Sequence, residues 1–329
     1  MNTREKLKRF FSLFTGSSKV LVVINADPDA IASAMAVKRL LWRKVHEVVI
    51  VHFNKITRPD NLAMIDLTEP GLKTLDEINK EDFHIFVIVD SQPDHHESFS
   101  GFPFHAIIDH HPVSADQAEY VDIRPGYGAC STMLTEYLKA KKIKPSSKLA
   151  AALMLGIKTD TSNFTRQAGI RDIKAFQYLY QFADNNIVTK VERALMTQED
   201  LDFLGHAIKH RKILKNRAFF HAGRITQPDE LVITADFFLT LARVNWSIVS
   251  GVLDKKLVIV IRNDGLRKGA GNTAKEAFAA FGSAGGHKTM ARAELDMGSV
   301  RKEIGSRAQK AVAQWIIDCI EQTAGKKIE

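Results

Sequence analysis

The chain has 329 residues, of which 45% are hydrophobic and 26% are charged, and its formal net charge is +8 at pH 7. These proportions are typical of a folded globular protein and exclude global disorder or a fibrous repeat. A chain of this length usually divides into two domains. The positive charge favours anionic partners such as phosphates and nucleic acids, because positive potential raises the local concentration of anions.

Cysteine usage and hydropathy bear on the cellular compartment. The two cysteines, Cys130 and Cys319, are too few and too far apart for a disulfide framework or a zinc cluster, which favours a reducing cytoplasm. No apolar run approaches the roughly 20 residues that a membrane-spanning helix needs, and the N-terminus lacks a signal-peptide pattern. We therefore expect a cytoplasmic protein without stable membrane insertion. The basic amphipathic segment 4–14 is expected to pack on the protein, with contact to a membrane or partner as the alternative.

The first half of the chain alternates short β-branched runs with helical patterns, which predicts a parallel sheet covered by helices. The predicted strands are 20–24, 48–53, 84–90 and 105–109. The predicted helices are 30–42, 130–140, 147–157 and 171–182, the third capped by Ser146 or Ser147. An α/β domain over residues 1–185 follows from this alternation.

The second half begins with a continuously helical and polar segment, residues 186–216, which is typical of a linker between domains. Beyond it, the predicted strands are 218–225, 231–234, 248–253 and 257–261. The predicted helices are 236–243, 273–281 and 300–320. This pattern predicts a second, smaller α/β domain over residues 217–329.

Acidic residues and histidines follow three predicted strands of the first domain, at the sheet edge where ligands of open α/β sheets gather, and Asp160 follows a predicted helix. Each acidic residue alone is more often structural, for example as a helix cap. Together they would repel one another severely unless cations neutralised them. Oxygen ligands with imidazole and no thiolate favour manganese or magnesium over zinc. Two such metal ions bound close together commonly serve phosphoester hydrolysis. The residues concerned are Asp27, Asp29, Asp90, Asp109, His110, His111 and Asp160.

These motifs resemble, in order, those of the DHH phosphoesterases. The superfamily includes the RecJ exonuclease, oligoribonucleases that also act on adenosine bisphosphate, cyclic dinucleotide phosphodiesterases and manganese pyrophosphatases. The matching segments are 27–33, the strand that ends in Asp90, Asp109-His110-His111 and 156–161. The resemblance covers nearly all of the chain and implies a parallel-sheet DHH domain joined by a helical linker to a substrate-binding domain.

The resemblance also implies roles for the site residues. Asp90 would bridge two Mn²⁺ ions, with Mg²⁺ as the alternative metal. Asp27 would bind one ion, whereas Asp29, His110 and Asp160 would bind the other. His111 would donate to the scissile phosphate, and Asp109 would orient its neighbours from behind the ligands.

Two features complicate this assignment. A second Asp-His-His string begins at Asp94, but no apolar strand leads into it, so we expect His95 and His96 to be surface loop residues. Many family members also carry a metal-binding histidine at the position of Val23, and valine cannot bind a metal. Asn25 is a candidate replacement. The ion on Asp27 is therefore expected to be held less tightly.

The second half carries a glycine-rich segment, 282–288, that resembles the histidine-terminated loop of the DHH-associated C-terminal domain. Gly285 and Gly286 would let backbone amides approach a phosphate, and His287 and Lys288 would add donors. Arg262, at the end of a predicted strand, stands where the family often has an arginine that binds substrate through paired hydrogen bonds. A simple turn is the alternative for the glycines.

The combined reading is a metal-dependent phosphoesterase with its active site between the two domains. The expected substrates are short single-stranded oligonucleotides or small nucleotides such as adenosine 3′,5′-bisphosphate. An inorganic pyrophosphatase or polyphosphatase is one alternative, and a nucleotide-binding regulator with a degenerate metal site is another. The sequence leaves a monomer and a homodimer open.

Overall fold

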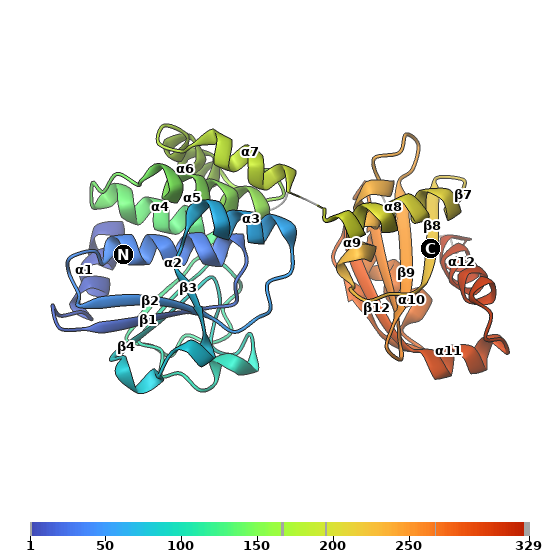
Figure 1. Ribbon diagram of the computed structural model, residues 1–329, viewed down its shortest axis with the longest axis horizontal. Coiled ribbons are helices and arrows are strands. Elements are labelled where there is room, and N and C mark those ends of the chain that lie inside the picture. The colour runs from blue at the N-terminus through green and yellow to red at the C-terminus, as the bar shows by residue number, and fades with distance from the viewer. Residues whose placement is uncertain (1, 166–167, 195, 267, 326–329) are drawn as a thin grey trace. The chain divides into compact units, whose positions relative to one another are not determined.

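A computed structural model describes residues 2–165, 168–194, 196–266 and 268–325 of the chain (Figure 1). The contacts divide the chain into two compact units, Met1–Leu195 and Met196–Glu329, referred to below as unit 1 and unit 2. Both are α/β in composition, so the fold class predicted from the sequence is confirmed. Within the described residues, every helix is too short or too polar to cross a membrane.

Unit 1 is built on a six-stranded sheet in the order β3-β2-β1-β4-β5-β6, and every strand pairing is parallel. The strands are β1 (Lys19–Ile24), β2 (Glu47–His52), β3 (Leu72–Thr74), β4 (Ile85–Val89), β5 (Ala106–Asp109) and β6 (Tyr120–Ile123). The helices are α1 (Thr3–Ser12), α2 (Pro28–Leu40), α3 (Pro59–Thr68), α4 (Cys130–Ala140), α5 (Ser147–Asp160), α6 (Ile170–Tyr180) and α7 (Asn185–Arg193). The carboxyl ends of all these strands therefore meet at one edge of the sheet.

Both faces of this sheet are buried, which explains why its strands are almost wholly apolar. Successive side chains of β1 point to opposite faces. Val20, Val22 and Ile24 pack in the large core with helices α2, α4 and α5. Leu21 and Val23 pack in a second apolar cluster that includes Phe99 and other aromatic residues.

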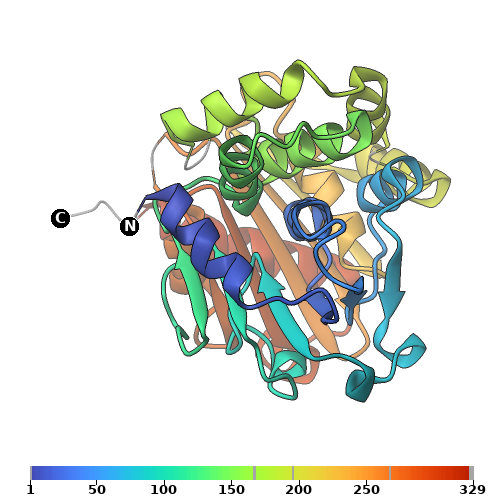
Figure 2. The same cartoon turned by 90° about the vertical axis from the view of Figure 1, so that its left-hand side faces the viewer.

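Helix α1 packs on unit 1, as predicted for the basic amphipathic segment. It begins with a capping box between Asn2 and Glu5, and it buries Leu7 and Phe10. Figure 2 shows this helix in dark blue, and it contacts α4 and β6. Lys6 on its buried side pairs with Asp122. The opposite side of the helix carries exposed cations.

Unit 2 contains a mixed six-stranded sheet in the order β11-β12-β10-β9-β8-β7, in which only β8 and β9 pair in parallel. The strands are β7 (Lys212–Leu214), β8 (Arg217–Arg224), β9 (Trp246–Leu253), β10 (Lys256–Asn263), β11 (Gly282–Gly286) and β12 (Met290–Asp296). The helices are α8 (Gln198–His210), α9 (Asp229–Phe238), α10 (Ala270–Phe278), α11 (Met297–Ile304) and α12 (Gln309–Gly325). Apolar clusters cover both faces of the sheet.

Several elements differ from the sequence prediction. The run 231–234, predicted as a strand, lies inside α9, where its apolar residues pack on the sheet. The single helix predicted over 300–320 is broken at Gly305, whose φ of 67° ends α11 in the left-handed conformation. The segment predicted as a linker, 186–216, contributes α7 to unit 1 and α8 to unit 2, and it ends in the short strand β7.

Candidate metal centre

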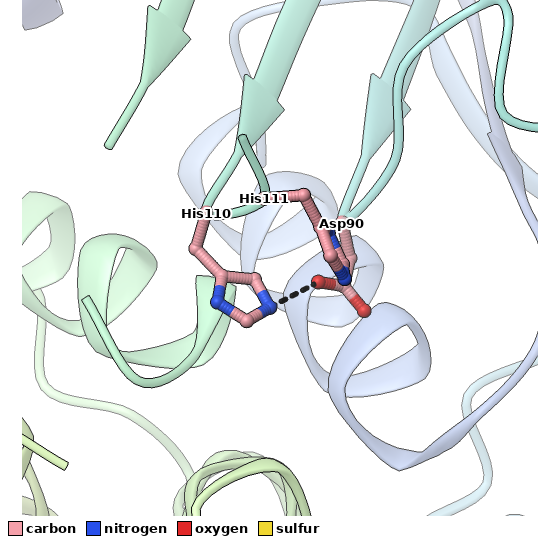
Figure 3. Close-up of side chains that lie close together, drawn as sticks. All are labelled: Asp90, His110 and His111. Atoms are coloured by element: carbon pink, nitrogen blue, oxygen red, sulfur yellow. Dashed lines mark ion pairs between the residues drawn. The ribbon is translucent and has the colours of Figure 1, made fainter. Parts of the chain in front are cut away.

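The carboxyl ends of β4 and β5 bring together the polar side chains that follow these strands. Asp90 comes directly after β4 and has a φ of 58°, a left-handed conformation that is uncommon for a residue with a side chain. Its backbone N–H donates to the carbonyl of Ile108 at 2.9 Å. Asp109 ends β5, and His110 and His111 follow it. Figure 3 shows His110 and Asp90 directed toward each other across this edge.

Four side chains form a compact acidic group at this edge, with ligand atoms that all lie within 4.8 Å of one another. His110 Nε2 is at its centre, 3.1 Å from Asp160 Oδ2, 3.2 Å from Asp90 Oδ1 and 4.0 Å from Asp29 Oδ2. Asp29 is fully buried, and Asp90 is only 8% exposed. We refer to Asp29, Asp90, His110 and Asp160 as the acidic group.

The buried atoms of the acidic group suit a cation. Asp90 Oδ1 and His110 Nε2 are both buried, yet neither makes a hydrogen bond despite their separation of 3.2 Å. His110 Nδ1 lies 3.2 Å from the carbonyl of Tyr127, which can only accept, so Nδ1 carries a proton. A cation would displace the proton of Nε2, and the ring would then present the lone pair of Nε2 as a ligand, which is the tautomer that binds metals.

The carboxylates of the acidic group are electrostatically strained without a cation. Burial, followed by the negative charge of Asp160, raises the pKa of Asp29 to about 6. Burial and the charges of Asp29 and Asp27 raise the pKa of Asp90 well above its ordinary value. Burial lowers the pKa of His110, but Asp160 and Asp90 outweigh burial and raise it to about 12. A divalent ion would relieve this strain by taking the place of the extra protons.

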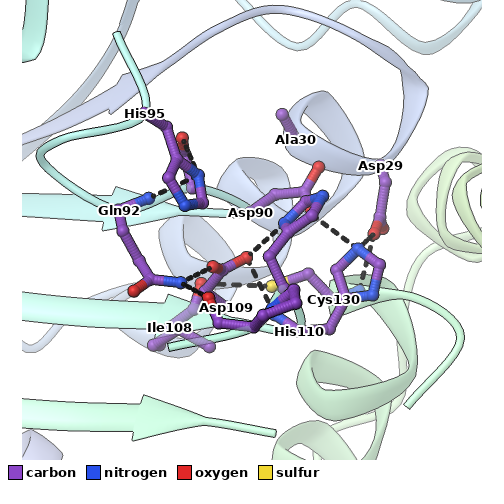
Figure 4. Close-up of polar contacts among 12 residues, drawn as sticks. Asp29, Ala30, Asp90, Gln92, His95, Ile108, Asp109, His110 and Cys130 are labelled. Atoms are coloured by element: carbon purple, nitrogen blue, oxygen red, sulfur yellow. Dashed lines mark hydrogen bonds and ion pairs between the residues drawn. The ribbon is translucent and has the colours of Figure 1, made fainter. Parts of the chain in front are cut away.

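Asp29 is positioned by helix α4 as well as by its own helix. Its Oδ2 accepts the backbone N–H of Cys130 at 2.6 Å, and its Oδ1 accepts that of Ser131 at 2.7 Å (Figure 4). These donors belong to the start of α4, where a carboxylate is also favoured by the helix dipole. Gly156 permits the close approach of α5, because a Cβ there would lie 2.9 Å from Asp29 Oδ1.

Asp109 lies behind the two histidines and orients them. Its Oδ1 is 2.8 Å from His111 Nδ1 and also accepts the backbone N–H of His110 at 2.8 Å. Its Oδ2 accepts Gln92 Nε2 at 2.7 Å. Burial raises the pKa of Asp109, but the hydrogen bonds from His111 and Gln92 outweigh burial and lower it. Asp109 is therefore an anion that holds the Nδ1 proton of His111 and leaves Nε2 for a ligand.

Gln92 was not anticipated from the sequence, although it is fully buried beside the site. Its amide nitrogen donates to Asp109 and to the carbonyl of Pro112, and its oxygen accepts the backbone N–H groups of Ser114 and Ala115. The side chain thus ties the loop after Asp90 to the loop after His111. A glutamine two residues after a motif aspartate is its only sequence signal.

The second Asp-His-His string lies in the loop after β4, and all three of its residues are exposed, as predicted for His95 and His96. His95 is nevertheless close to the site, because its ring contacts that of His111 edge to face with centroids 5.6 Å apart. Its Nδ1 is 3.2 Å from the backbone nitrogen of Gln92. His96 stacks on Phe53 away from this contact.

Asp27 stands apart from the acidic group. Its side chain caps α2 by accepting the backbone N–H of Ala30 at 2.9 Å, which is the helix-cap alternative considered for this residue. Desolvation raises the pKa of Asp27 to about 6. The hydrogen bond from Ala30 lowers this pKa, and the negative charge of Asp29 raises it further. Within the described residues, the other close group around Asp90 and His110 is completed by His111 rather than by Asp27.

Val23 pairs with Val51 on one side and Ile88 on the other in the middle of the sheet, and it is fully buried. Its side chain belongs to the apolar cluster on the face opposite α2. Val23 therefore does not pack against α2, the helix that follows its strand. Asn25 is exposed.

The candidate substrate-binding residues of unit 2 do not form the predicted loop. Gly282–Gly286 is the edge strand β11, and the register of β10 with β12 places Arg262 opposite Met290. Gly286 has a φ of 149°, and a Cβ there would lie 2.3 Å from the carbonyl oxygen of Met290, so its glycine serves close backbone packing. Gly285 is partly exposed.

At the end of β11, the backbone N–H of His287 donates to the carbonyl of Met290 at 2.7 Å. The backbone N–H groups of Ala270 and Gly271, which begin α10, donate to the carbonyls of Lys288 and His287. The side chains of His287 and Lys288 are exposed. Arg262 donates through Nε to Asp236 at 2.7 Å and through Nη1 to the carbonyl of Ile261 at 3.4 Å, and this leaves Nη2 for another acceptor.

Comparison with known proteins agrees with this architecture. Residues 19–157 match the N-terminal domain of the DHH family. An uncharacterised protein of Methanocaldococcus jannaschii is 32% identical over 307 residues, which cover 92% of this chain and 63% of that protein. The cyclic-di-AMP phosphodiesterase GdpP of Geobacillus thermodenitrificans is 29% identical over 256 residues, which cover 73% of this chain and 34% of that protein.

A solved structure shares the fold of the whole chain. An exopolyphosphatase-related protein from Bacteroides fragilis aligns with a TM-score of 0.73 and 17% identity, over 97% of this chain and 96% of the other. Residues 19–157 therefore carry a DHH-family N-terminal domain, which agrees with the resemblance inferred from the motifs. It spans less than two thirds of the length of the two sequence relatives.

Proposed function

We propose that this protein hydrolyses phosphoester bonds with divalent metal ions, and that its substrates are short oligonucleotides or small nucleotides such as adenosine 3′,5′-bisphosphate. The observation that carries the proposal is the acidic group, in which a buried carboxylate oxygen of Asp90 and the buried Nε2 of His110 face each other without a hydrogen bond. Its relative among the phosphodiesterases, the cyclic-di-AMP enzyme, supports the same class of reaction.

The acidic group is proposed to hold one ion, through Asp29, Asp90, His110 and Asp160. Asp90 and Asp27 would hold a second ion, and the Oδ2 of Asp27 is not the atom that accepts the Ala30 N–H. Carboxylate and imidazole ligands suit Mn²⁺, with Mg²⁺ as the alternative. Bound ions of this kind activate a water molecule and stabilise charge on the phosphoryl oxygens.

The remaining residues are proposed to bind and orient the substrate. His111, held by Asp109 through Nδ1, would donate to the scissile phosphate through Nε2, which requires a ring protonated at both nitrogens. From unit 2, Arg262 and Lys288 would contribute charged donors and His287 a ring N–H, whereas Gly285 and Gly286 shape the strand that precedes His287 and Lys288. Guanidinium and phosphate form charge-assisted hydrogen bonds, which are stronger than neutral ones.

The test is a hydrolysis panel run on chelator-treated protein to which Mn²⁺ or Mg²⁺ is returned. The panel comprises short oligonucleotides, adenosine 3′,5′-bisphosphate, a cyclic dinucleotide and pyrophosphate. We expect turnover of the first two that requires the metal and disappears in Asp90→Ala. The control is Asp94→Ala, which removes an exposed aspartate four residues away whose Oδ1 only accepts Ser114 Oγ.

Each of the other outcomes would contradict the proposal in a definite way. Full turnover after exhaustive chelation, or in Asp90→Ala, would mean that the site is misplaced. Hydrolysis of pyrophosphate alone would favour the pyrophosphatase alternative. Nucleotide binding without any hydrolysis in the presence of metal would favour the alternative of a nucleotide-binding regulator with a degenerate metal site.

A further inference from the structure

A basic hollow lies in unit 1, away from the candidate metal centre. It encloses about 760 Å³ between α1, the turn that follows α2 and the end of α4. Helices α2 and α4 both begin beside Asp29 and run away from it toward the hollow. Because α2 has 13 residues, the hollow is roughly 20 Å from the metal centre. It is therefore a separate feature of the same unit.

Among the residues that the structure describes, the hollow is lined by five cations and by no acidic residue. Among the described residues, none of their charged groups has an ion pair or a hydrogen bond, in contrast to Lys6 on the other side of α1, which pairs with Asp122. We call these residues, whose charges share one concave surface, the basic cluster. They are Arg4, Lys8, Arg43, Lys44 and Lys141.

Aromatic rings hold part of the basic cluster in place. Phe11 lies in the wall of the hollow, and its ring centroid is 5.3 Å from Lys44 Nζ and 4.9 Å from Lys141 Nζ. Cation–π contacts of this kind attract the ammonium groups to the ring. Arg43 has a φ of 60°, so the backbone adopts an uncommon conformation at the turn that carries two of the cations. The cluster is thus organised by the fold.

Uncompensated cations at such short range repel one another, and a bound anion would remove the repulsion. The ends of α2 and α4 oppose an anion, since each contributes a partial negative charge of roughly one half. The five full positive charges outweigh these partial charges. A single phosphate carries at most about two negative charges, which is fewer than the cluster can neutralise.

We propose that the basic hollow is a binding site for an anion that carries two or more phosphate groups. Its volume falls within the range of sites for small molecules. The shared chemistry is a cluster of phosphates, and either a soluble polyphosphorylated molecule or a phosphorylated lipid headgroup can supply it. The proposal is independent of hydrolysis at the metal centre.

Calorimetry with sodium tripolyphosphate on chelator-treated full-length protein tests the site. The variant Lys44→Gln/Lys141→Gln removes two charges and keeps side chains long enough to cover Phe11. The matched control, Lys174→Gln/Lys190→Gln, removes two exposed lysines from α6 and α7. We expect binding that weakens with salt, becomes about tenfold weaker in the first variant and changes less than about twofold in the control.

A second arm identifies the source of the phosphates. Cosedimentation is measured with phosphatidylcholine vesicles that contain or lack phosphatidylinositol 4,5-bisphosphate. Cluster-dependent binding of tripolyphosphate alone supports a soluble ligand, and cluster-dependent binding of the phosphorylated vesicles supports a headgroup. The variant Arg4→Gln/Lys8→Gln, on the exposed side of α1, repeats the test if the first variant folds poorly. Failure to bind either probe, or equal binding by wild type, cluster variants and control, would overturn the proposal.

Discussion

Replacement of Asp90 by asparagine separates a metal-binding role from a structural one, because the two roles predict opposite changes in stability. The pKa of Asp90 is raised well above its ordinary value, by burial first and then by Asp29 and Asp27. Around neutral pH and without metal, the folded state therefore binds more protons than the unfolded state, and stability falls as the pH rises. Asparagine has nearly the same shape and removes this ionisable group.

The size of the effect follows from the geometry of the acidic group. Two unit charges 4.8 Å apart interact by about 3.5 kcal/mol at an effective dielectric constant of about 20. Protons bound by the neighbouring carboxylates relieve part of this repulsion. We expect metal-free Asp90→Asn to be more stable than wild type by on the order of 1 to 2 kcal/mol at about pH 8. Loss of a similar attraction to a cation should weaken Mn²⁺ binding roughly 300-fold.

The assay is urea denaturation of chelated protein, followed by titration with Mn²⁺. Wild type should gain stability with metal, because the ion binds the folded state, and Asp90→Asn should gain little. The control is Asp122→Asn. Burial raises the pKa of Asp122, but Arg124 outweighs burial and lowers it, so this variant should lose stability and keep its response to metal. A destabilised Asp90→Asn that still responds fully to Mn²⁺ would refute the reasoning.

Four further predictions concern the same site and unit 2. Because the pKa of Asp29 is raised to about 6, metal-free protein should lose stability as the pH rises through that value, while the melting-temperature gain from Mn²⁺ increases; a flat pH profile would contradict this. His111→Ala should lower kcat by roughly a hundredfold and leave calorimetric Mn²⁺ binding unchanged. Arg262→Ala and His287→Ala should each raise KM for nucleotides by an amount that corresponds to about 2 kcal/mol of lost binding free energy, without altering metal affinity. Unchanged kinetics in both variants would exclude a role of these residues in substrate binding. Val23→His should lower the melting temperature, since it buries a polar ring in an apolar cluster. A stable variant that binds Mn²⁺ more tightly would contradict this prediction and would indicate that a histidine at this position binds metal, as in other family members.

The central strands of unit 1 could be predicted because they are buried on both faces. Such strands appear in the sequence as continuous apolar runs, and β1 and β4 are examples. Strands β3 and β6 are short and lie at the two edges of the sheet, where the pattern is mixed. Their existence depends on pairing with a neighbouring strand, which local sequence does not reveal.

Unit 2 was harder to predict because its local preferences conflict with its packing. The run 231–234 contains the β-branched residues Val232 and Ile233, yet it is helical because one face of α9 covers the sheet. Strand β11 is mostly glycine and alanine, residues that disfavour strands, and it forms by pairing with β12. In both cases tertiary contacts override propensity.

From the sequence, helix capping and metal binding are alternatives for an aspartate, but the position of Asp29 in the structure is compatible with both. Asp29 accepts two backbone N–H groups of α4 and still lies within ligand distance of Asp90 and His110. Each carboxylate oxygen has a second lone pair, so a hydrogen bond to one side leaves the other side for a ligand. The two N–H groups hold the orientation of the side chain before any ion arrives, which lowers the entropy that binding must remove. The capping contacts of Asp29 therefore favour its proposed role as a ligand, whereas Asp27 is more exposed.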